Sequence, residues 1–487
     1  MFEKKSSFQV KEVFTLVVQL EELYADFVVI GSGPAGQKAA IQAAKLGKSV
    51  VMIEKYPNPG GGCLHSGTIP SKSLREAILN LTDFHKKSYY SKHDVQEHDI
   101  SINDLNYCLN QVTEEQIRQL HRQFEKNNIK LIQGAAHFEN HHQIAVLDDN
   151  NHLTHIITGE KTLLATGSKP RNPKNVPFDK EMVLDSTRLL SIDHVPKRMV
   201  VLGGGIIGSE YASFFAALGT EVIVVDKKEQ MLPYLDKEIG QHLQSSLSKI
   251  GLQFIGNRDF DEIIRHKDEV EVKFNDGSSL KSEMLLYALG RVANVDHLHI
   301  ENVGISVDSK GYIPVNALFQ TIVPNIYAVG DVIGGPSLAS TSMEQGRLAA
   351  RHAFGAETHH FPTFYPIGIY TIPEISSCGY TEEQLKNLGF RYEVGRAYYY
   401  EIAKNTIAGN DPGMFKLLFH ADTLEILGIH IIGRDATEVI HIGQVAMTHS
   451  ARIDYFIDQV FNYPTYAEGY RIAALNGFNK VKHKRWF

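Results

Sequence analysis

Residues 27–55 read FVVIGSGPAGQKAAIQAAKLGKSVVMIEK, an apolar run, a glycine turn, a stretch of small residues and a second apolar run that reaches an acid. This order predicts a strand, a helix and a parallel strand, the βαβ unit that binds dinucleotides. Gly31 permits the tight turn, Gly33 lets a pyrophosphate approach the backbone, and Gly36 lets the helix pack on the strand. Glu54 follows Gly36 by 18 residues and suits the hydroxyls of a ribose.

Residues 199–228 repeat this pattern as MVVLGGGIIGSEYASFFAALGTEVIVVDKK. The corresponding glycines are Gly203, Gly205 and Gly208, and Asp226 takes the place of the acid. Both helices would present free N–H groups to a phosphate at their N-termini. Two such modules predict an α/β fold with two Rossmann-like dinucleotide-binding domains.

The second module leaves the choice of nucleotide open. Asp226 suits the free 2′-hydroxyl of NAD, whereas the adjacent Lys227 and Lys228 could pair with the 2′-phosphate of NADP. The two lysines could equally be solvated surface residues. The sequence therefore permits NAD and NADP.

Length and composition place the chain among multidomain globular proteins. It has 487 residues, of which 43% are hydrophobic, and a net charge of −7 that argues against non-specific binding to nucleic acid. Its three scattered cysteines fit a reducing compartment, and no apolar run of about 18 residues predicts a membrane span. We interpret residues 1–23 as a local N-terminal extension or a mis-chosen start, and not as a signal peptide.

The spacing of apolar residues predicts the secondary structure of the rest of the chain. We expect an amphipathic helix over 105–128, short strands over 130–168 and a hairpin over 269–280. From about residue 364, strands such as MFKLLFH and ILGIHIIG alternate with helices, which predicts a third, α+β domain. The predicted domains are 1–23, an extension; 24–170 with 291–360; 171–290; and 361–487.

The segment 59–75, PGGGCLHSGTIPSKSLR, carries further chemistry. Its glycine run, which includes Gly61 and Gly62, suits backbone contact with a large flat ligand. Cys63 follows, but Thr68 stands five residues later, where a second cysteine would close a redox loop. The 23 histidines do not show the spacing of a metal site, so no metal is expected.

Four motifs extend the pattern to most of the chain: GGGC with T and PSK, GGGIIGSEYA, ALGR and IYAVGDV. With them the sequence, from about residue 24 to 487, resembles the pyridine nucleotide–disulfide oxidoreductase superfamily. The resemblance implies FAD in the first module, a nicotinamide nucleotide in the second and a C-terminal dimerisation domain. It also implies a homodimer or larger homo-oligomer in which the C-terminal tail reaches the partner's flavin.

The same resemblance assigns roles to individual residues. Lys72 would lie near the flavin N5 and pair with Glu210, and these two are the expected catalytic residues. Gly290 would border the nicotinamide nucleotide, together with the second glycine turn and Asp226. The FAD site would comprise Gly31, Gly33, Gly36, Glu54, Gly61, Gly62, Cys63, Lys72, Gly167, Asp331 and Ala339.

Two departures from the superfamily pattern sharpen this reading. The redox pair CxxxxC is reduced to Cys63 with Thr68, and the HPTxxE motif near the C-terminus reads YPTYAE, so Tyr463 replaces the histidine while Glu468 is kept. A disulfide reductase needs two thiols and a base. The chain resembles instead a soluble transhydrogenase branch that lacks the dithiol.

The function that follows is FAD-dependent transfer of reducing equivalents between NADPH and NAD⁺, ping-pong through FADH₂ without a redox disulfide. The alternatives are a dihydrolipoamide dehydrogenase-like enzyme, an NADH oxidase or diaphorase, and a non-catalytic FAD-binding protein. The sequence leaves two roles open for Cys63, a packed small residue or a polarisable contact with the flavin. We expect a cytoplasmic protein with neither nucleic acid nor membrane as a partner.

Overall fold

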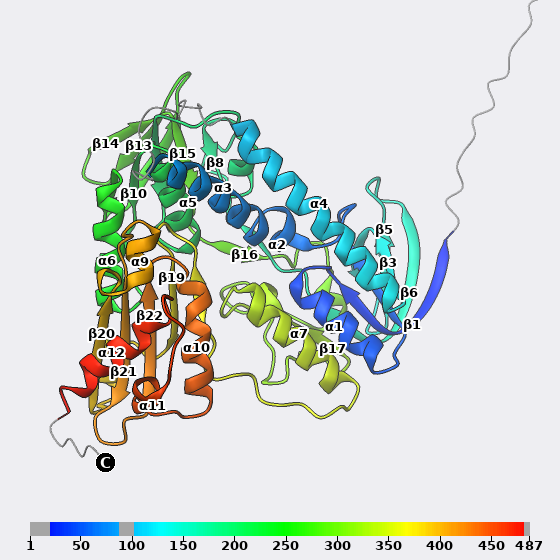
Figure 1. Cartoon of the computed structure of the whole chain (residues 1–487). Helices are drawn as coiled ribbons and strands as arrows, with labels where there is room; N and C mark the ends of the chain where they lie inside the picture. Colours follow the sequence, from blue (N-terminus) through cyan, green and yellow to red (C-terminus); the bar gives the residue numbers. More distant parts are fainter. Residues whose placement is uncertain (1–19, 87–101, 482–487) are drawn as a thin grey trace, which may run out of the picture.

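The computed structural model describes residues 20–86 and 102–481, which form three units, each built on its own principal sheet (Figure 1). The first unit has seven strands, in the order β3-β2-β1-β6-β5-β4 with β17 beside β6. Its parallel part joins β1, β2, β3, β6 and β17, and β4 and β5 add an antiparallel edge. The bounds are β1 Glu21–Ile30, β2 Val50–Glu54, β3 Ile129–Gln133, β4 Ala135–Phe138, β5 Gln143–Leu147, β6 Leu153–Leu164 and β17 Ile326–Ala328.

The first strand starts earlier than the apolar run indicated. β1 begins at Glu21 and not at Phe27, because the long β6 continues the ladder and pairs Glu21 with His155. Glu21 also forms an ion pair with Lys130 of β3, at 2.6 Å. Backbone pairing and this ion pair compensate for the polar start of the strand.

Helices cover this sheet because their small residues allow close packing. α1 (Pro34–Lys45) buries Ala39, Ala40 and Ala43, and it crosses α7 (Ala339–Ala353). A Cβ on Gly346 of α7 would lie only 2.1 Å from the carbonyl oxygen of Ala35. Glycine is therefore required where the two helices cross.

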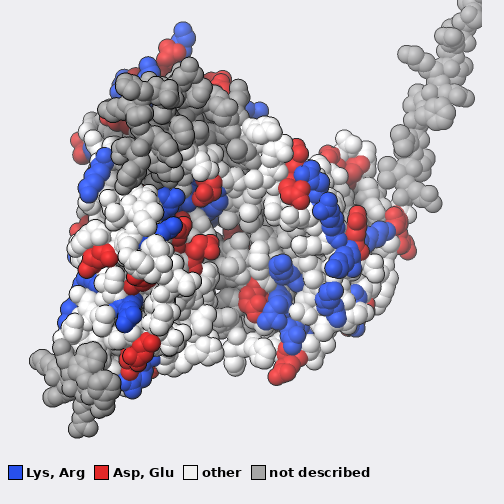
Figure 2. Space-filling view, in the orientation of Figure 1, with Lys and Arg blue, Asp and Glu red and all other residues white. Residues whose placement is uncertain are grey.

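The predicted amphipathic helix is confirmed as α4 (Ile102–Lys126). It buries Leu120 and Phe124 and exposes Arg118, Arg122 and Lys126. Figure 2 shows basic side chains in a row over this helix. The side chain of Cys108, which also falls in this helix, lies outside the described residues.

The second unit has a parallel sheet in the order β11-β10-β9-β15-β8. The predicted hairpin forms two strands of a separate three-stranded antiparallel sheet in the same unit. The hairpin turn is confirmed at Asp276 and Gly277, where Gly277 has φ +81°. The bounds are β8 Val183–Leu184, β9 Arg198–Leu202, α5 Ile206–Ala217, β10 Glu221–Val225, α6 Lys237–Lys249, β11 Leu252–Ile255, β12 Phe260–Arg265, β13 Val270–Phe274, β14 Ser279–Ser282 and β15 Met284–Tyr287.

A two-stranded ribbon links the first two units. β7 (Ser168–Pro170) pairs antiparallel with β16 (Arg291–Ala293). The chain leaves the first unit through β7 and returns to it through β16. The two passages therefore lie side by side, next to the site described below.

The third unit is an antiparallel sheet in the order β18-β19-β22-β21-β20 with helices against it. The apolar runs MFKLLFH and ILGIHIIG are confirmed as its strands β21 and β22. The bounds are β18 Ile367–Ile369, β19 Ile375–Gly379, α8 Glu382–Asn387, β20 Tyr392–Tyr398, α9 Ala403–Ala408, β21 Met414–His420, β22 Ile426–Ile432, α10 Ala436–Thr448, α11 Asp454–Asp458 and α12 Glu468–Phe478.

A buried cation joins the third unit to the second. Lys416 of β21 is 1% exposed, and its ammonium lies 2.8 Å from Asp236, 3.0 Å from Glu238 and 2.7 Å from Glu382. Arg396 adds a second cation on Glu238, at 2.7 Å. A buried charge is tolerated only when it is paired, so this cluster fixes how the two sheets meet.

None of the helices in the described part of the chain combines the length and the apolar character that a membrane span needs.

Candidate functional site: two dinucleotide turns and a lysine–glutamate pair

The first glycine turn has a different requirement at each glycine. Gly31 has φ +101°, and a Cβ there would lie 2.4 Å from the carbonyl oxygen of Ala165. A Cβ on Gly36 would lie 2.0 Å from the carbonyl oxygen of Gly31, so the helix packs directly on the strand. Gly33 borders open space, at an N-terminus of α1 that no side chain caps. Open space beside uncapped N–H groups suits a pyrophosphate.

The second turn has the same geometry. Gly203 has φ +112°, and a Cβ there would lie 2.6 Å from the carbonyl oxygen of Ala288. A Cβ on Gly208 would lie 1.9 Å from the carbonyl oxygen of Gly203. Gly205 again borders open space, at the uncapped N-terminus of α5. Both turns therefore leave room only at the middle glycine.

The acid at the end of each second strand is hydrogen-bonded to its own glycine turn. Glu54 is buried and accepts hydrogen bonds from the backbone N–H and the hydroxyl of Ser32, and from the N–H of Tyr56 at 3.1 Å. Asp226 accepts from the N–H of Gly204 at 2.6 Å and of Lys228 at 2.8 Å. In both modules the acid thus holds the residue that follows the first glycine. These bonds leave free lone pairs on each carboxylate for ribose hydroxyls.

The glycine run of residues 60–62 lies against the first turn. A Cβ on Gly61 would lie 2.9 Å from the Cα of Gly33, and the N–H of Gly60 donates to the hydroxyl of Ser32 at 2.9 Å. Gly62 has only the hydroxyl of Ser66 nearby, 3.6 Å from a Cβ placed on it. The structure therefore brings the two predicted FAD-binding glycine runs together.

Cys63 lies in the short helix α2 (Gly61–His65), and Thr68 begins α3 (Thr68–Lys86). Burial raises the pKa of the Cys63 thiol, although a hydrogen bond with the Thr68 side chain and the charge of Lys72 oppose that rise. The thiol therefore stays protonated near neutral pH. Its neighbour at position 68 is a hydroxyl, which cannot form a disulfide.

Lys72 and Glu210 form an ion pair across two units. The ammonium of Lys72 lies 2.7 Å from a carboxylate oxygen of Glu210, and their side chains are 23% and 5% exposed. Lys72 belongs to α3 and Glu210 to α5. The other oxygen of Glu210 accepts the N–H of Tyr370 from the third unit, at 2.8 Å. Tyr370 was not expected from the sequence.

Asp331 lies in a 3₁₀ turn, η3 (Gly330–Ile333), and accepts the hydroxyl of Ser168 at 2.6 Å. The guanidinium of Arg291 donates to the same hydroxyl at 2.8 Å. Gly167, with φ +69°, directly precedes Ser168 and borders open space. The β7–β16 ribbon thus places Gly167 beside Asp331, and it adds Ser168 and Arg291, which sequence reasoning missed.

The remaining predicted residues lie at element ends. Ala339 is the first residue of α7, the helix that follows η3. Gly290 follows β15, has φ +103°, borders open space and accepts the N–H of Arg171 through its carbonyl at 3.1 Å. Ala339 therefore lies in the first unit and Gly290 at the ribbon that links it to the second.

The C-terminal motif lies apart from this cluster within one chain. Tyr463 is 73% exposed, and Glu468 begins α12. Figure 1 shows α11 and α12 at an end of the third unit remote from α2. One carboxylate oxygen of Glu468 is buried without a hydrogen-bond partner among the described residues.

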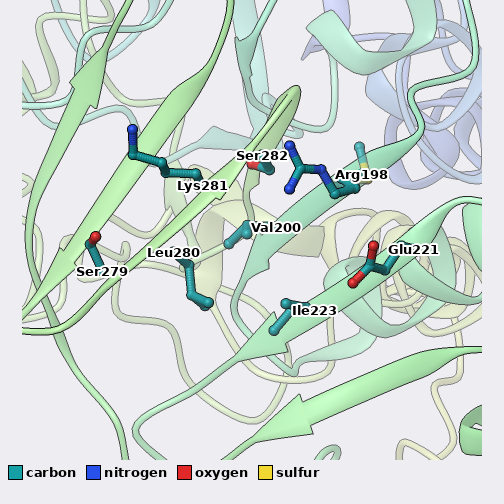
Figure 3. A pocket seen from close by; sticks show the side chains of 9 residues that line it. Arg198, Val200, Glu221, Ile223, Ser279, Leu280, Lys281 and Ser282 are labelled. Carbon is teal, nitrogen blue, oxygen red and sulfur yellow. The ribbon is translucent and has the colours of Figure 1, made fainter.

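A pocket of about 330 Å³ lies away from these residues, on the second unit (Figure 3). It opens between β9, β10 and β14, and Arg198 and Glu221, the first residues of their strands, mark the end opposite the glycine turn. It therefore does not belong to the nucleotide site. The described residues contain no cluster of His, Cys, Asp or Glu that could hold a metal ion. The lining residues of the pocket are Arg198, Met199, Val200, Glu221, Ile223, Ser279, Leu280, Lys281 and Ser282.

Family models match nearly the whole chain. The model of the pyridine nucleotide-disulphide oxidoreductases matches residues 25–346, and the model of their dimerisation domain matches residues 365–474. The chain is 44% identical over 457 residues to the soluble pyridine nucleotide transhydrogenase of Mycobacterium bovis, covering 94% of this chain and 98% of that protein. It is 43% identical over 460 residues to the protein of the same name from Salmonella paratyphi B, with the same coverage of 94% and 98%.

Solved structures have the same fold. The HOCl-induced flavoprotein disulfide reductase RclA from Escherichia coli superposes with a TM-score of 0.83 at 28% identity, covering 92% of this chain and 99% of that chain. LpdA from Mycobacterium tuberculosis superposes with a TM-score of 0.86 at 24% identity, covering 93% and 99%, a likeness of fold alone.

Proposed function

The chain belongs to the pyridine nucleotide-disulphide oxidoreductase family, as its motifs predicted, and on that premise we propose that it is an FAD enzyme that transfers reducing equivalents between NADPH and NAD⁺. Relatives named soluble pyridine nucleotide transhydrogenase, which it matches over 94% of its length, support this activity. The alternative within the family is the reduction of a disulfide substrate.

The residues of the first unit fit FAD. Gly33 leaves open space at an uncapped helix end, where the pyrophosphate would bind, and Glu54 keeps a free lone pair for the adenosine ribose. Asp331, beside Gly167, would hold the ribityl chain. Bound FAD supplies the ability to take up two electrons from one nicotinamide nucleotide and return them to another.

Gly61, Gly62, Cys63 and Ala339 complete the proposed FAD site. Gly61 supports this assignment through its contact with Gly33, and Gly62 leaves the space above its Cα open. We interpret Cys63 as a neutral, non-nucleophilic contact, because burial keeps its thiol protonated.

Lys72 would place a fixed positive charge next to the cofactor, and Glu210 would orient it. A preorganised charge in a partly buried site stabilises negative charge that develops during electron transfer. The 2.7 Å ion pair, with Glu210 only 5% exposed, supports this role for both residues. They are the proposed catalytic pair.

The second unit would bind the two nicotinamide nucleotides in turn. Gly205 offers the open helix end, Asp226 the ribose acceptor, and Gly290 the border of the nucleotide. Gly203 and Gly208 shape the turn by close contact with the backbone. Lys227 forms an ion pair with Asp259 at 2.7 Å, whereas Lys228 is exposed and forms no ion pair among the described residues.

The observation that carries the proposal is the pairing of Cys63 with Thr68. In this family the second sulfur of the redox disulfide would stand at position 68, where the chain has a threonine hydroxyl close to the thiol. Electrons delivered by NADPH would then have no dithiol to enter. This supports transfer to a second nucleotide over reduction of a disulfide.

Assembly and location follow as further proposals. The dimerisation-domain match over residues 365–474 indicates a homo-oligomer, and we propose a homodimer in which Tyr463 and Glu468 lie near the partner's cofactor. The buried, unpartnered oxygen of Glu468 supports a polar contact from outside the described chain. The free thiols of Cys63 and Cys378 support the cytoplasm as the location. The proposed domains are 24–170 with 291–360 for FAD, 171–290 for the nucleotide and 361–487 for the dimer.

The test is turnover with three acceptors. The purified FAD-loaded protein is given NADPH and, in separate reactions, a thio-NAD⁺ analogue, oxidised lipoamide or O₂. We expect reduction of thio-NAD⁺ to exceed the other two by at least about 100-fold. Faster reduction of lipoamide would make it a disulfide reductase, and faster reduction of O₂ an oxidase.

A further inference from the structure

Tyr370 contacts both members of the Lys72–Glu210 pair. Its ring centroid lies 4.8 Å from the ammonium of Lys72, and its backbone N–H donates to Glu210 at 2.8 Å. Tyr370 follows β18, in the third unit, while its two partners come from the first and second. One residue of the C-terminal unit therefore touches both halves of the proposed catalytic pair.

The surroundings of Tyr370 hold its ring in place. The Tyr370 hydroxyl lies close to the side chain of Thr437, on α10. Four residues after Tyr370, Glu374 forms a buried ion pair with Arg75 of α3 at 2.9 Å, with side chains 6% and 7% exposed. Arg75 also lies 6.0 Å from the Tyr370 ring. The loop is thus fixed to the helix that carries Lys72.

A lysine ammonium on its flexible stem needs more than one contact to keep a single position. Lys72 has the carboxylate of Glu210 and the hydroxyl of Ser71, 3.2 Å away, as hydrogen-bond acceptors. An aromatic face attracts a cation and excludes water from one side of it. The Tyr370 ring therefore restricts the ammonium to one position.

We propose that Tyr370 is a positioning residue that holds the charge of Lys72 toward the bound FAD. The inference rests on the proposed function in one respect, that Lys72 faces the cofactor. It extends that function, because a residue of the C-terminal unit would then influence the midpoint potential of the bound FAD. Removal of the ring would let the ammonium move into solvent, and the negative charge gained on reduction would be less stabilised.

The test measures the midpoint potential of bound FAD, by equilibration with a reference dye, in the full-length protein. For Tyr370→Leu we expect about a tenfold weaker preference for the reduced cofactor, from a partly desolvated cation–π contact. That factor is about 30 mV for a two-electron couple, toward lower potential. Tyr370→Phe, which keeps the ring, should retain the wild-type potential.

Three further variants make the result decisive. Lys72→Met should lower the potential at least as much as Tyr370→Leu. Tyr365→Leu should leave it unchanged, because Tyr365, five positions before Tyr370, packs against Phe361. Tyr370→Met, whose flexible side chain fills the gap, replaces the leucine variant if that protein does not fold.

The inference is overturned if the potential stays at the wild-type value without the ring, if Lys72→Met leaves it unchanged, or if Tyr365→Leu shifts it equally. The readout does not depend on transhydrogenation. If the wild-type protein fails to reduce thio-NAD⁺, the proposed function is refuted. The inference about Tyr370 is still decided by the midpoint potentials of the variants.

Discussion

The ammonium of Lys72 lies 2.7 Å from the carboxylate of Glu210, although 138 positions separate the two residues in the sequence. The pair joins α3 of the first unit to α5 of the second, and Tyr370 brings the third unit to the same point. The site is therefore a junction of all three units, and its geometry depends on how they pack.

Glu210→Gln tests the charge of the pair. Glutamine keeps the shape of the side chain and an oxygen for the Tyr370 N–H, but it leaves Lys72 without its counter-ion. We expect kcat to fall about tenfold and the folded state to lose about 1–2 kcal/mol. Steady-state kinetics and thermal unfolding check these values. Glu114→Gln, on an exposed pair with Arg118 at 3.8 Å, should change neither, and equal losses in both variants would contradict the role of Glu210.

The glycines of the first turn predict two distinct phenotypes. Gly36→Ala places a Cβ 2.0 Å from the carbonyl oxygen of Gly31 and should destabilise the apoprotein by about 3 kcal/mol. Gly33→Ala meets open space, so the apoprotein should melt as the wild type does but retain less FAD. FAD content per subunit and apoprotein melting separate the two effects. Normal FAD binding by Gly33→Ala would show that the pyrophosphate does not approach this backbone.

The two lysines after Asp226 should contribute differently to the binding of NADPH. Lys228 is exposed and forms no ion pair among the described residues, whereas Lys227 is paired with Asp259. We expect Lys228→Ala to weaken NADPH binding about tenfold, since it removes a cation available to the 2′-phosphate, and to leave NADH unchanged. Binding is followed by anaerobic titration, with Lys227→Ala as the matched control. An equal loss for NADH would assign Lys228 a role other than phosphate recognition.

Local pattern predicted the units of this fold because the relevant interactions are local. The strand, glycine turn and helix of residues 27–55 lie within one βαβ unit, and the glycine requirement at Gly36 arises from its contact with Gly31 inside the turn. The start of β1 could not be predicted, because it depends on the length of β6, more than 100 positions away.

The contacts between units could not be predicted from the sequence. Tyr370 follows an apolar strand, and neither its sequence neighbours nor its residue type indicate a contact with Lys72. Lys416 did offer a signal, as a lysine inside the apolar run MFKLLFH, which predicts either an exposed face or a buried ion pair. Its partners, Asp236 and Glu382, come from separate segments, so only the structure identifies them.

The Lys416 cluster should make the protein sensitive to acid. Burial opposes it, but hydrogen bonds from Lys416 and Lys386 lower the pKa of Glu382 from 4.5 to about 2. A depressed folded-state pKa gives stability that is complete above the unfolded value and is lost as pH falls toward the folded value. We therefore expect the wild-type melting temperature to fall between pH 5 and pH 3, with about 2 kcal/mol of the loss from this residue.

Lys416→Met is the matching substitution. It leaves Asp236, which is fully buried, and Glu382 without their shared cation, and should cost about 3 kcal/mol at pH 7. The loss on acidification should then be smaller than in the wild type. Lys386→Met removes a 58% exposed partner of the same carboxylate and should have little effect at pH 7. An unchanged acid dependence in Lys416→Met would show that the cluster does not control it.

The central claim, that bound FAD is the only two-electron store in the chain, is tested most directly by anaerobic reductive titration. We expect the wild-type protein to take up two electrons per subunit, because Cys63 faces Thr68 and not a second thiol. Thr68→Cys, oxidised in air before the titration, should take up four. Uptake of four electrons per subunit by the wild type would contradict the account.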